Sequence, residues 1–302
     1  MVKEVYFEMV DDNDLRKPGL LMTANWDSNV GYAWWLMETY WVVLAEAYKD
    51  SMTPVVAYPS ISIVPSAIEE SSLVPTVQDF SRLSISRVAS QLRFIVRHRV
   101  RALYMSDKPV KSWVYVLFRM AGVKTIVVHD HTPGLRTRPT GLKRAVKQLM
   151  SRIPLYGADV CMGATEFVRQ RLIDVACMPA SKCFSVPNGI PLDIPSPQSI
   201  HEAYDIPEDR QVIVTAARAN HYKGGFFALE VLAKVKAEHG MNNWHYVFMG
   251  DGPHREDFIR KARALGIEDC VSFPGRVTQV TAKFQPASFA LHPSYGEVGY
   301  SL

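Results

Sequence analysis

Short apolar runs alternate with helical patterns along most of the chain. In the first half, six runs rich in Val, Ile and Leu predict strands, and five stretches between them space their apolar residues as helices do. The predicted strands cover residues 19–25, 53–59, 100–106, 124–130, 158–164 and 182–188, and the predicted helices 32–48, 82–99, 110–121, 141–152 and 166–176. This alternation is typical of βαβ units around a parallel sheet.

The alternation pauses at "GIPLDIPSPQSI", which holds three prolines. We therefore expect a linker at 191–200 between an N-terminal domain (1–190) and a C-terminal domain (201–302). After the pause, strands are predicted in "QVIVTAA", "WHYVFMG", "CVSFPG" and "SFALHPS", and helices at 225–239, at 254–265 and near 278–285. Two α/β domains that face a cleft are the simplest arrangement, with ligands at the carboxyl ends of the strands.

Composition places the chain among ordinary globular proteins. Its 302 residues are 48% hydrophobic and 21% charged, which is enough apolar material for a sizeable core. The four cysteines lack CxxC spacing and predict reduced thiols rather than a zinc site. No basic leader precedes an apolar run, and no stretch of about 18 apolar residues occurs, so we expect a cytoplasmic protein.

Positive charge gathers in the first half of the chain. Residues 80–106 hold six arginines and no acid, and residues 131–158 hold six Lys or Arg and no acid. Such helices could lie on the anionic inner face of a membrane or collect phosphorylated ligands, and a solvated basic face is the plainer alternative. Nucleic acid is not expected as a partner, because no recognised binding motif accompanies the charge.

Candidate chemistry in the second half lies where strands end. Arg218 and Lys223 occupy "AARANHYKGG", between a predicted strand and the next helix. Two cations near a helix N-terminus suit a diphosphate and could stabilise charge on a departing nucleoside diphosphate. Gly250 and Gly252 in "FMGDGP" could let the backbone approach a ligand, or could only form a tight turn.

Polar residues also follow strands of the first half. His129 and His131 in "VVHDHTPG" could contact substrate; a metal pair is the minority interpretation, because nothing nearby completes a site. Asn29 and Gly31 in "ANWDSNVGYAWW" predict a turn that holds an acceptor or a phosphate. The Asp12-Asn13-Asp14 stretch has the form of a metal-binding DxD, but it precedes the first main strand and is interpreted as surface.

Several ordered motifs together resemble a GT-B glycosyltransferase of the family 4 type. "KCFSVPNGIPLD", which contains Asn188, resembles the family's interdomain motif, and "VTAARANHYKGG", which contains Gly224, resembles its arginine and lysine loop. "VFMGDGPHREDFIRKARALGIEDCVSFPGRV" and "LHPSYGEVGYSL" resemble the motifs that follow. The resemblance implies two Rossmann-like doubly wound domains facing a cleft. In the first half it is looser and leaves the acceptor open.

The resemblance also implies roles for individual residues. Arg218 and Lys223 would neutralise the leaving diphosphate, Glu297 would orient the donor sugar, and His129 would contact that sugar from the opposite domain. Gly224, Gly250, Gly252 and Asn188 would bind the donor, and Asn29, Gly31 and His131 would lie on the acceptor side. No metal or other cofactor would be required. The family's second glutamate would fall at position 305, so we expect a C-terminally truncated chain with an incomplete second domain.

Three functions fit these observations. The first is a retaining, metal-independent glycosyltransferase that moves a sugar from a UDP- or GDP-sugar to a glycan or lipid-linked acceptor, in polysaccharide or glycolipid synthesis. The second is an inactive binding or scaffold protein on the same fold, and the third is a nucleotide-sugar epimerase. Retention of Arg218, Lys223 and Glu297 favours the first, whereas the absent second glutamate would favour the second.

Overall fold

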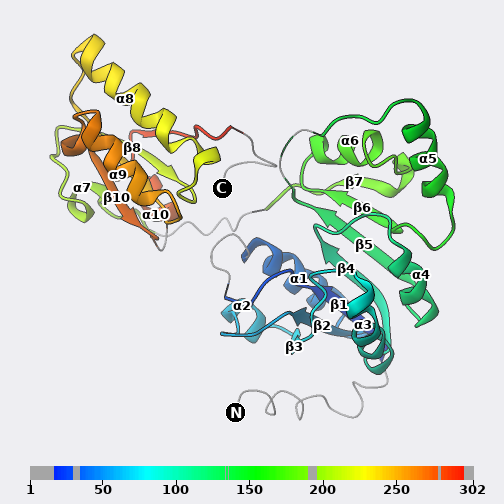
Figure 1. The fold of residues 1–302 in the computed structure, drawn as a ribbon. Helices are drawn as coiled ribbons and strands as arrows, with labels where there is room; N and C mark the ends of the chain where they lie inside the picture. Colours follow the sequence, from blue (N-terminus) through cyan, green and yellow to red (C-terminus); the bar gives the residue numbers. More distant parts are fainter. Residues whose placement is uncertain are drawn as a thin grey trace. The chain divides into compact units, whose positions relative to one another are not determined.

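A computed structural model describes residues 17–29, 35–132, 134, 136–189, 196–277 and 280–295. The chain divides into two compact units, Met1–Gly189 and Ile190–Leu302 (Figure 1). The domain boundaries expected from the sequence stay a prediction. The fold class itself is confirmed, because each unit is a parallel sheet flanked by helices. Within the described residues, no helix is both long enough and apolar enough to cross a membrane.

The N-terminal unit is built on a seven-stranded parallel sheet with the order β3-β2-β1-β4-β5-β6-β7. Its strands are β1 (Gly19–Thr23), β2 (Thr53–Tyr58), β3 (Val74–Val77), β4 (Val100–Ser106), β5 (Thr125–Asp130), β6 (Val160–Gly163) and β7 (Cys183–Ser185). Its helices are α1 (Trp35–Tyr48), α2 (Ser66–Glu69), α3 (Ile85–Arg97), α4 (Trp113–Met120), α5 (Gly141–Arg152) and α6 (Glu166–Asp174).

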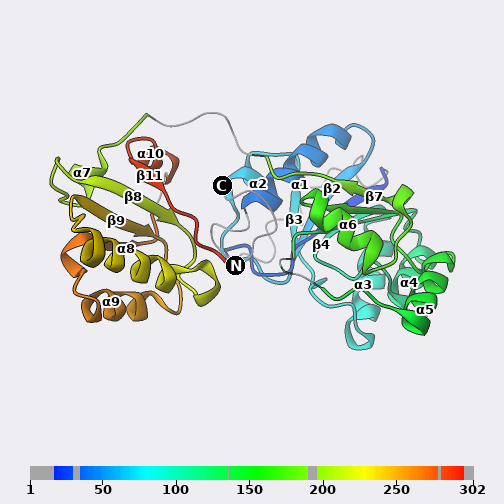
Figure 2. The ribbon, with the colours of Figure 1, turned by 90° about the horizontal axis from the view of Figure 1, so that it is seen from above.

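Helices cover both faces of this sheet. On one face, Trp41 of α1 and Ile68 of α2 join the core formed with β1 and β2. On the other, Phe94 of α3, Phe118 of α4 and Leu172 of α6 pack against the central strands. Figure 2 shows α1 on one side of the strands and α3, α4 and α5 on the other. The central strands are buried on both faces, as their continuous apolar runs require.

The C-terminal unit repeats this plan at smaller size. Its parallel sheet has the order β10-β9-β8-β11, with strands β8 (Gln211–Ala216), β9 (Trp244–Met249), β10 (Val271–Gly275) and β11 (Phe289–Ala290). Its helices are α7 (Ile200–Ala203), α8 (Gly225–His239), α9 (Arg255–Ala264) and α10 (Val280–Phe284). Leu229 of α8 and Phe258 of α9 fill one core, and Ile200 of α7 fills a second with Val212 and Val214.

Most elements expected from the sequence are confirmed. β4, α5 and α8 have the predicted bounds, and the other predicted strands and helices differ from the structure at their ends. The local pattern of residues did not predict β3, α2 or α7, and α7 begins at the last residue of the expected linker. β3 pairs with β2 and forms one edge of the N-terminal sheet.

Candidate functional site

Three loops meet at the carboxyl ends of the C-terminal sheet. After β8, the Ala219 amide donates to the Asp251 carbonyl at 2.9 Å, and the His254 amide donates to the Ala219 carbonyl at 3.0 Å. The Tyr295 amide, beyond β11, donates to the Tyr222 carbonyl at 2.9 Å. These backbone hydrogen bonds join the loops after β8, β9 and β11 into one rim.

Three glycines for which the sequence predicts a role in donor binding allow these loops to approach one another closely. A side chain at Gly224 would collide with the carbonyl of Pro293, and one at Gly250 with the carbonyl of Ala217. At Gly252 an added Cβ would lie 2.5 Å from the carbonyl of Ala219. Gly224 also has a φ of 73°, a conformation that other residues seldom adopt. Their role in donor binding stays a prediction, but the structure gives each a packing reason to be glycine.

Arg218 and Lys223 lie on the part of the rim that follows β8. Arg218 is exposed, and Lys223 is half-buried with its ammonium 5.4 Å from the Tyr222 ring centre. A short 3₁₀ turn, His221–Lys223, leads through Gly224 into α8, whose first amides lack partners within the helix. Lys223 is therefore beside a helix N-terminus, and Arg218 lies earlier on the same loop, an arrangement that favours a diphosphate. Glu297 lies outside the described residues.

In the N-terminal unit, His129 is the last but one residue of β5 and lies inside the protein. Its side chain is 0% exposed, and its Nδ1 shares a 2.6 Å hydrogen bond with the Tyr104 hydroxyl. The ring centre of His131 is 3.9 Å away and that of Tyr40 is 5.2 Å away. Burial, followed by the nearby His131, lowers the pKa of His129 to about 3. Burial likewise lowers the pKa of His131 to about 4, so both rings are neutral at pH 7.

These rings make the N-terminal unit sensitive to acid. A histidine whose folded pKa lies below its unfolded value of about 6.5 stabilises the protein above that pH and loses this contribution as the pH falls toward the folded pKa. When the pH falls from 7 to 5, we expect the resistance of His129 to protonation to lower the unfolding free energy by about 2 kcal/mol. Asp107, whose pKa is raised to about 6 by burial, acts in the opposite direction.

Urea unfolding of wild type and His129→Gln at both pH values isolates this effect from Asp107. The difference in unfolding free energy between the two proteins should shrink at pH 5. A constant difference would show that His129 does not resist protonation.

The other predicted residues of this unit are near the carboxyl ends of its strands. The Tyr40 hydroxyl donates to the Pro187 carbonyl at 2.9 Å and to Asn188 Oδ1 at 3.4 Å, which fixes the half-buried Asn188 beside α1. The exposed Asn29 donates its backbone amide to Asp27 Oδ1 at 2.9 Å. Gly31 and the Asp12 and Asp14 pair lie outside the described residues.

A polar network that the sequence motifs did not mark lies at the same edge. The Lys108 ammonium donates to Asn25 Oδ1 and to the Ser81 carbonyl, and Asn25 Nδ2 donates to the Ser106 carbonyl at 2.9 Å. Burial lowers the pKa of Lys108 to about 8. Asn25 and Lys108 stand at or just beyond the ends of predicted strands, so the strand-end rule could have found them.

A second unexpected contact holds the loop after β5. Arg171 of α6 donates to Asp130 Oδ2 at 3.1 Å and to the Thr132 and Gly134 carbonyls, each at 2.7 Å. The side chains of Arg171 and Asp130 are only 4% and 11% exposed, so this ion pair is largely shielded from water. Among the residues that the structure describes, no three His, Cys, Asp or Glu side chains gather as metal ligands would.

Comparison with solved structures identifies the fold. The chain resembles a glycosyltransferase from Rickettsia africae ESF-5 with a TM-score of 0.69 at 14% identity, covering 92% of this chain and 73% of that one. It resembles HepE of Anabaena in complex with UDP (TM-score 0.63, 14% identity, 91% and 74% covered). It also resembles sucrose-phosphate synthase from Thermosynechococcus elongatus (TM-score 0.62, 13% identity, 95% and 77% covered). The fold is therefore GT-B.

A comparison of the sequence with protein-family models matches part of the C-terminal unit. Residues 197–299 match the family described as "Glycosyl transferases group 1". The matched segment contains the rim formed by the loops after β8, β9 and β11. No curated protein sequence matches the chain.

Proposed function

We propose that this protein is a glycosyltransferase that moves a sugar from a nucleotide donor to a glycan or lipid-linked acceptor, with retention at the anomeric carbon. The match of residues 197–299 to the glycosyl transferases group 1 family supports sugar transfer. The C-terminal unit would bind the nucleotide sugar at the carboxyl ends of its strands. HepE in complex with UDP, which shares the fold, supports a nucleotide donor. Synthesis of cell-surface polysaccharide or glycolipid is the setting we propose.

The observation that carries this proposal is the cationic rim after β8. Arg218 and Lys223 lie on one loop, which hydrogen bonds to the glycine turn after β9 and to the segment after β11. When the bond between sugar and diphosphate breaks, negative charge builds on the leaving group. We assign the stabilisation of that charge to Arg218 and Lys223, whose own charges would replace a metal ion. Glu297 keeps its proposed contact with the donor sugar.

Product stereochemistry tests the proposed reaction. The protein is incubated with UDP- and GDP-sugars of known anomeric configuration and with lipid or glycan acceptors. Proton NMR then gives the configuration of the new linkage. The proposal predicts the configuration of the donor, and an inverted linkage would rule out retention.

We further propose that the N-terminal unit binds to the surface of an anionic membrane through α5. This helix turns polar side chains toward the protein, where Lys147 Nζ donates to the Val175 carbonyl and Ser151 Oγ to the Cys177 carbonyl. None of its residues is buried. A row of exposed apolar side chains runs along the helix and continues into the residue that follows it: Leu142, Val146, Leu149 and Ile153. Lys143 and Arg152 are exposed on the same helix, so α5 combines apolar area with positive charge, as a helix in a lipid interface does.

Vesicle sedimentation tests this surface. Leu142 and Leu149 are 81% and 66% exposed, so changing both to Gln should leave stability nearly unchanged and weaken binding to phosphatidylglycerol vesicles about tenfold or more. Met241→Gln, at a position 51% exposed in the other unit, is the control and should bind as wild type does. Equal binding by all three proteins would exclude α5 as the membrane contact.

A further inference from the structure

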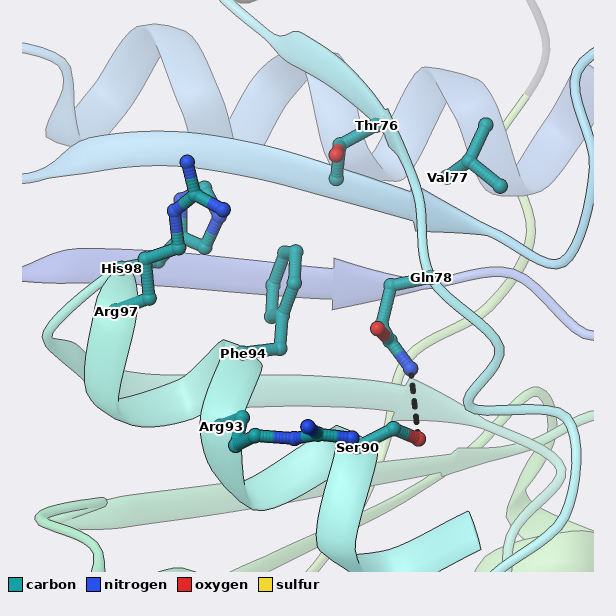
Figure 3. A pocket seen from close by; sticks show the side chains of 8 residues that line it. All are labelled: Thr76, Val77, Gln78, Ser90, Arg93, Phe94, Arg97 and His98. Carbon is teal, nitrogen blue, oxygen red and sulfur yellow. Dashed lines mark hydrogen bonds between the residues drawn. The ribbon is translucent and has the colours of Figure 1, made fainter. Parts of the chain in front are cut away.

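The N-terminal unit has a pocket at the β3 edge of its sheet. The pocket lies between β3 and α3 and has a volume of about 330 Å³ (Figure 3). Gln78 follows β3 on one side, and α3 supplies Ser90, Arg93, Phe94 and Arg97 on the other. None of these residues belongs to the rim of the C-terminal unit, so the proposed donor site does not account for the pocket.

The pocket combines two arginines with neutral hydrogen-bonding groups. Arg93 and Arg97 are four residues apart on α3 and therefore share one face of that helix. Gln78 Nε2 donates to Ser90 Oγ at 3.4 Å, and Figure 3 shows this contact at one end of the pocket. None of the eight side chains that line the pocket is acidic. Asp79, next in the chain, forms an ion pair with Arg87, which does not line the pocket.

Aromatic rings lie beside this charge. The rings of Phe94 and His98 are stacked with centroids 4.1 Å apart and an interplanar angle of 29°. The pKa of His98 is lowered, first by burial and then by the positive charge of Arg97. Arg97 and His98 are consecutive residues at the end of α3, and both line the pocket.

We propose that this pocket binds the phosphate group of a small polar molecule, with Arg93 and Arg97 as its cationic ligands. A guanidinium offers several donors in one plane and pairs with phosphate oxygens through two hydrogen bonds. The Gln78 amide and the Ser90 hydroxyl add neutral partners. The volume is within the range of small-molecule sites and accommodates a phosphate with a sugar- or glycerol-sized group. The phosphate could belong to a soluble metabolite or to a lipid headgroup.

NMR on the whole chain tests this site with glycerol 3-phosphate as the probe and glycerol as its uncharged control. The Lys223→Ala background weakens competing anion binding at the rim of the C-terminal unit. We expect the backbone amide signals of Gln78, Ser90 and His98 to shift with glycerol 3-phosphate and not with glycerol. Changing both Arg93 and Arg97 to Gln should weaken this binding tenfold or more. Arg82→Gln, an exposed arginine of the same acid-free segment that does not line the pocket, should not.

A second arm separates the two sources of phosphate. The same amide signals are followed with small vesicles of phosphatidylglycerol and of phosphatidylcholine. Shifts with glycerol 3-phosphate support a soluble ligand, and shifts only with phosphatidylglycerol vesicles support a headgroup. No shift in either arm would overturn the proposal, as would equal binding by the double variant and by Arg82→Gln. Nucleotide binding by the C-terminal unit is measured separately, so either proposal can fail alone.

Discussion

Replacing Lys223 with Ala should lower sugar transfer about 10²–10³-fold, which is the usual effect of removing one group that stabilises charge in a transition state. Lys223 stands beside the N-terminus of α8, on the loop that hydrogen bonds to the segments after β9 and β11. We expect the loss mainly in kcat, because charge on the diphosphate increases as the sugar departs. Turnover at saturating donor measures it.

The fold should survive this change. Lys223 is on a surface loop, where the contribution of one cation to stability is small. Thermal unfolding should therefore match that of wild type. Lys234→Ala removes an exposed lysine from the middle of α8 and controls for a general loss of positive charge. A Lys223→Ala protein with wild-type turnover would contradict the assignment of this residue.

Replacing Arg171 with Met should reduce the unfolding free energy of the N-terminal unit by about 3–5 kcal/mol. The change removes the cation that pairs with the largely buried Asp130 and leaves that carboxylate without an ionic partner, with only the hydrogen bonds from Thr132 to its Oδ1. It also removes the hydrogen bonds to the Thr132 and Gly134 carbonyls, which hold the loop after β5. Urea unfolding, followed by a probe in the N-terminal unit, measures the loss.

A double variant identifies the cause of that loss. Asp130→Asn combined with Arg171→Met removes both charges, so no buried carboxylate stays unpaired, and its unfolding free energy should exceed that of Arg171→Met alone. A double variant less stable than Arg171→Met would show that the ion pair is not what makes Arg171 important.

Most of this fold can be predicted from the sequence because burial on both faces makes central strands continuously apolar. β4 and β5 each carry such a run, and each pairs in parallel with its neighbours as expected. Helices α5 and α8 were predicted from the spacing of their apolar residues. Both begin at a glycine, and the residue before that glycine has a non-helical backbone conformation. Local pattern and tertiary structure agree in these segments.

β3 escaped prediction for a physical reason. It is only four residues long and contains Pro75, which normally argues against a strand. Its position at the sheet edge removes this objection, because one side of an edge strand needs no ladder partner. The edge position depends on contacts with β2, such as Val56 opposite Pro75, and a local pattern cannot reveal them.

The positions of several candidate residues could be predicted from the sequence, and their roles stay predictions. The rule that ligands bind at strand ends led to Arg218, Lys223 and His129, and the structure places His129 in the last two residues of β5 and the other two on the loop between β8 and α8. It also places Lys108, which the motifs did not mark, just beyond the end of β4. The pairing of Arg171 with Asp130 joins residues 41 positions apart and depends on how α6 packs beside β5. Such contacts follow from the folded structure rather than from local spacing.

Calorimetric titration of the chain with UDP and GDP, and with their sugar conjugates, tests the central claim most directly. A nucleotide-sugar transferase should bind one of the two nucleotides with micromolar or tighter affinity, and Arg218→Ala and Lys223→Ala should each weaken that binding. The Lys234→Ala control should bind as wild type does. If wild type bound neither nucleotide, or if both rim variants bound as tightly as wild type, the C-terminal unit would not use this rim for a nucleotide donor.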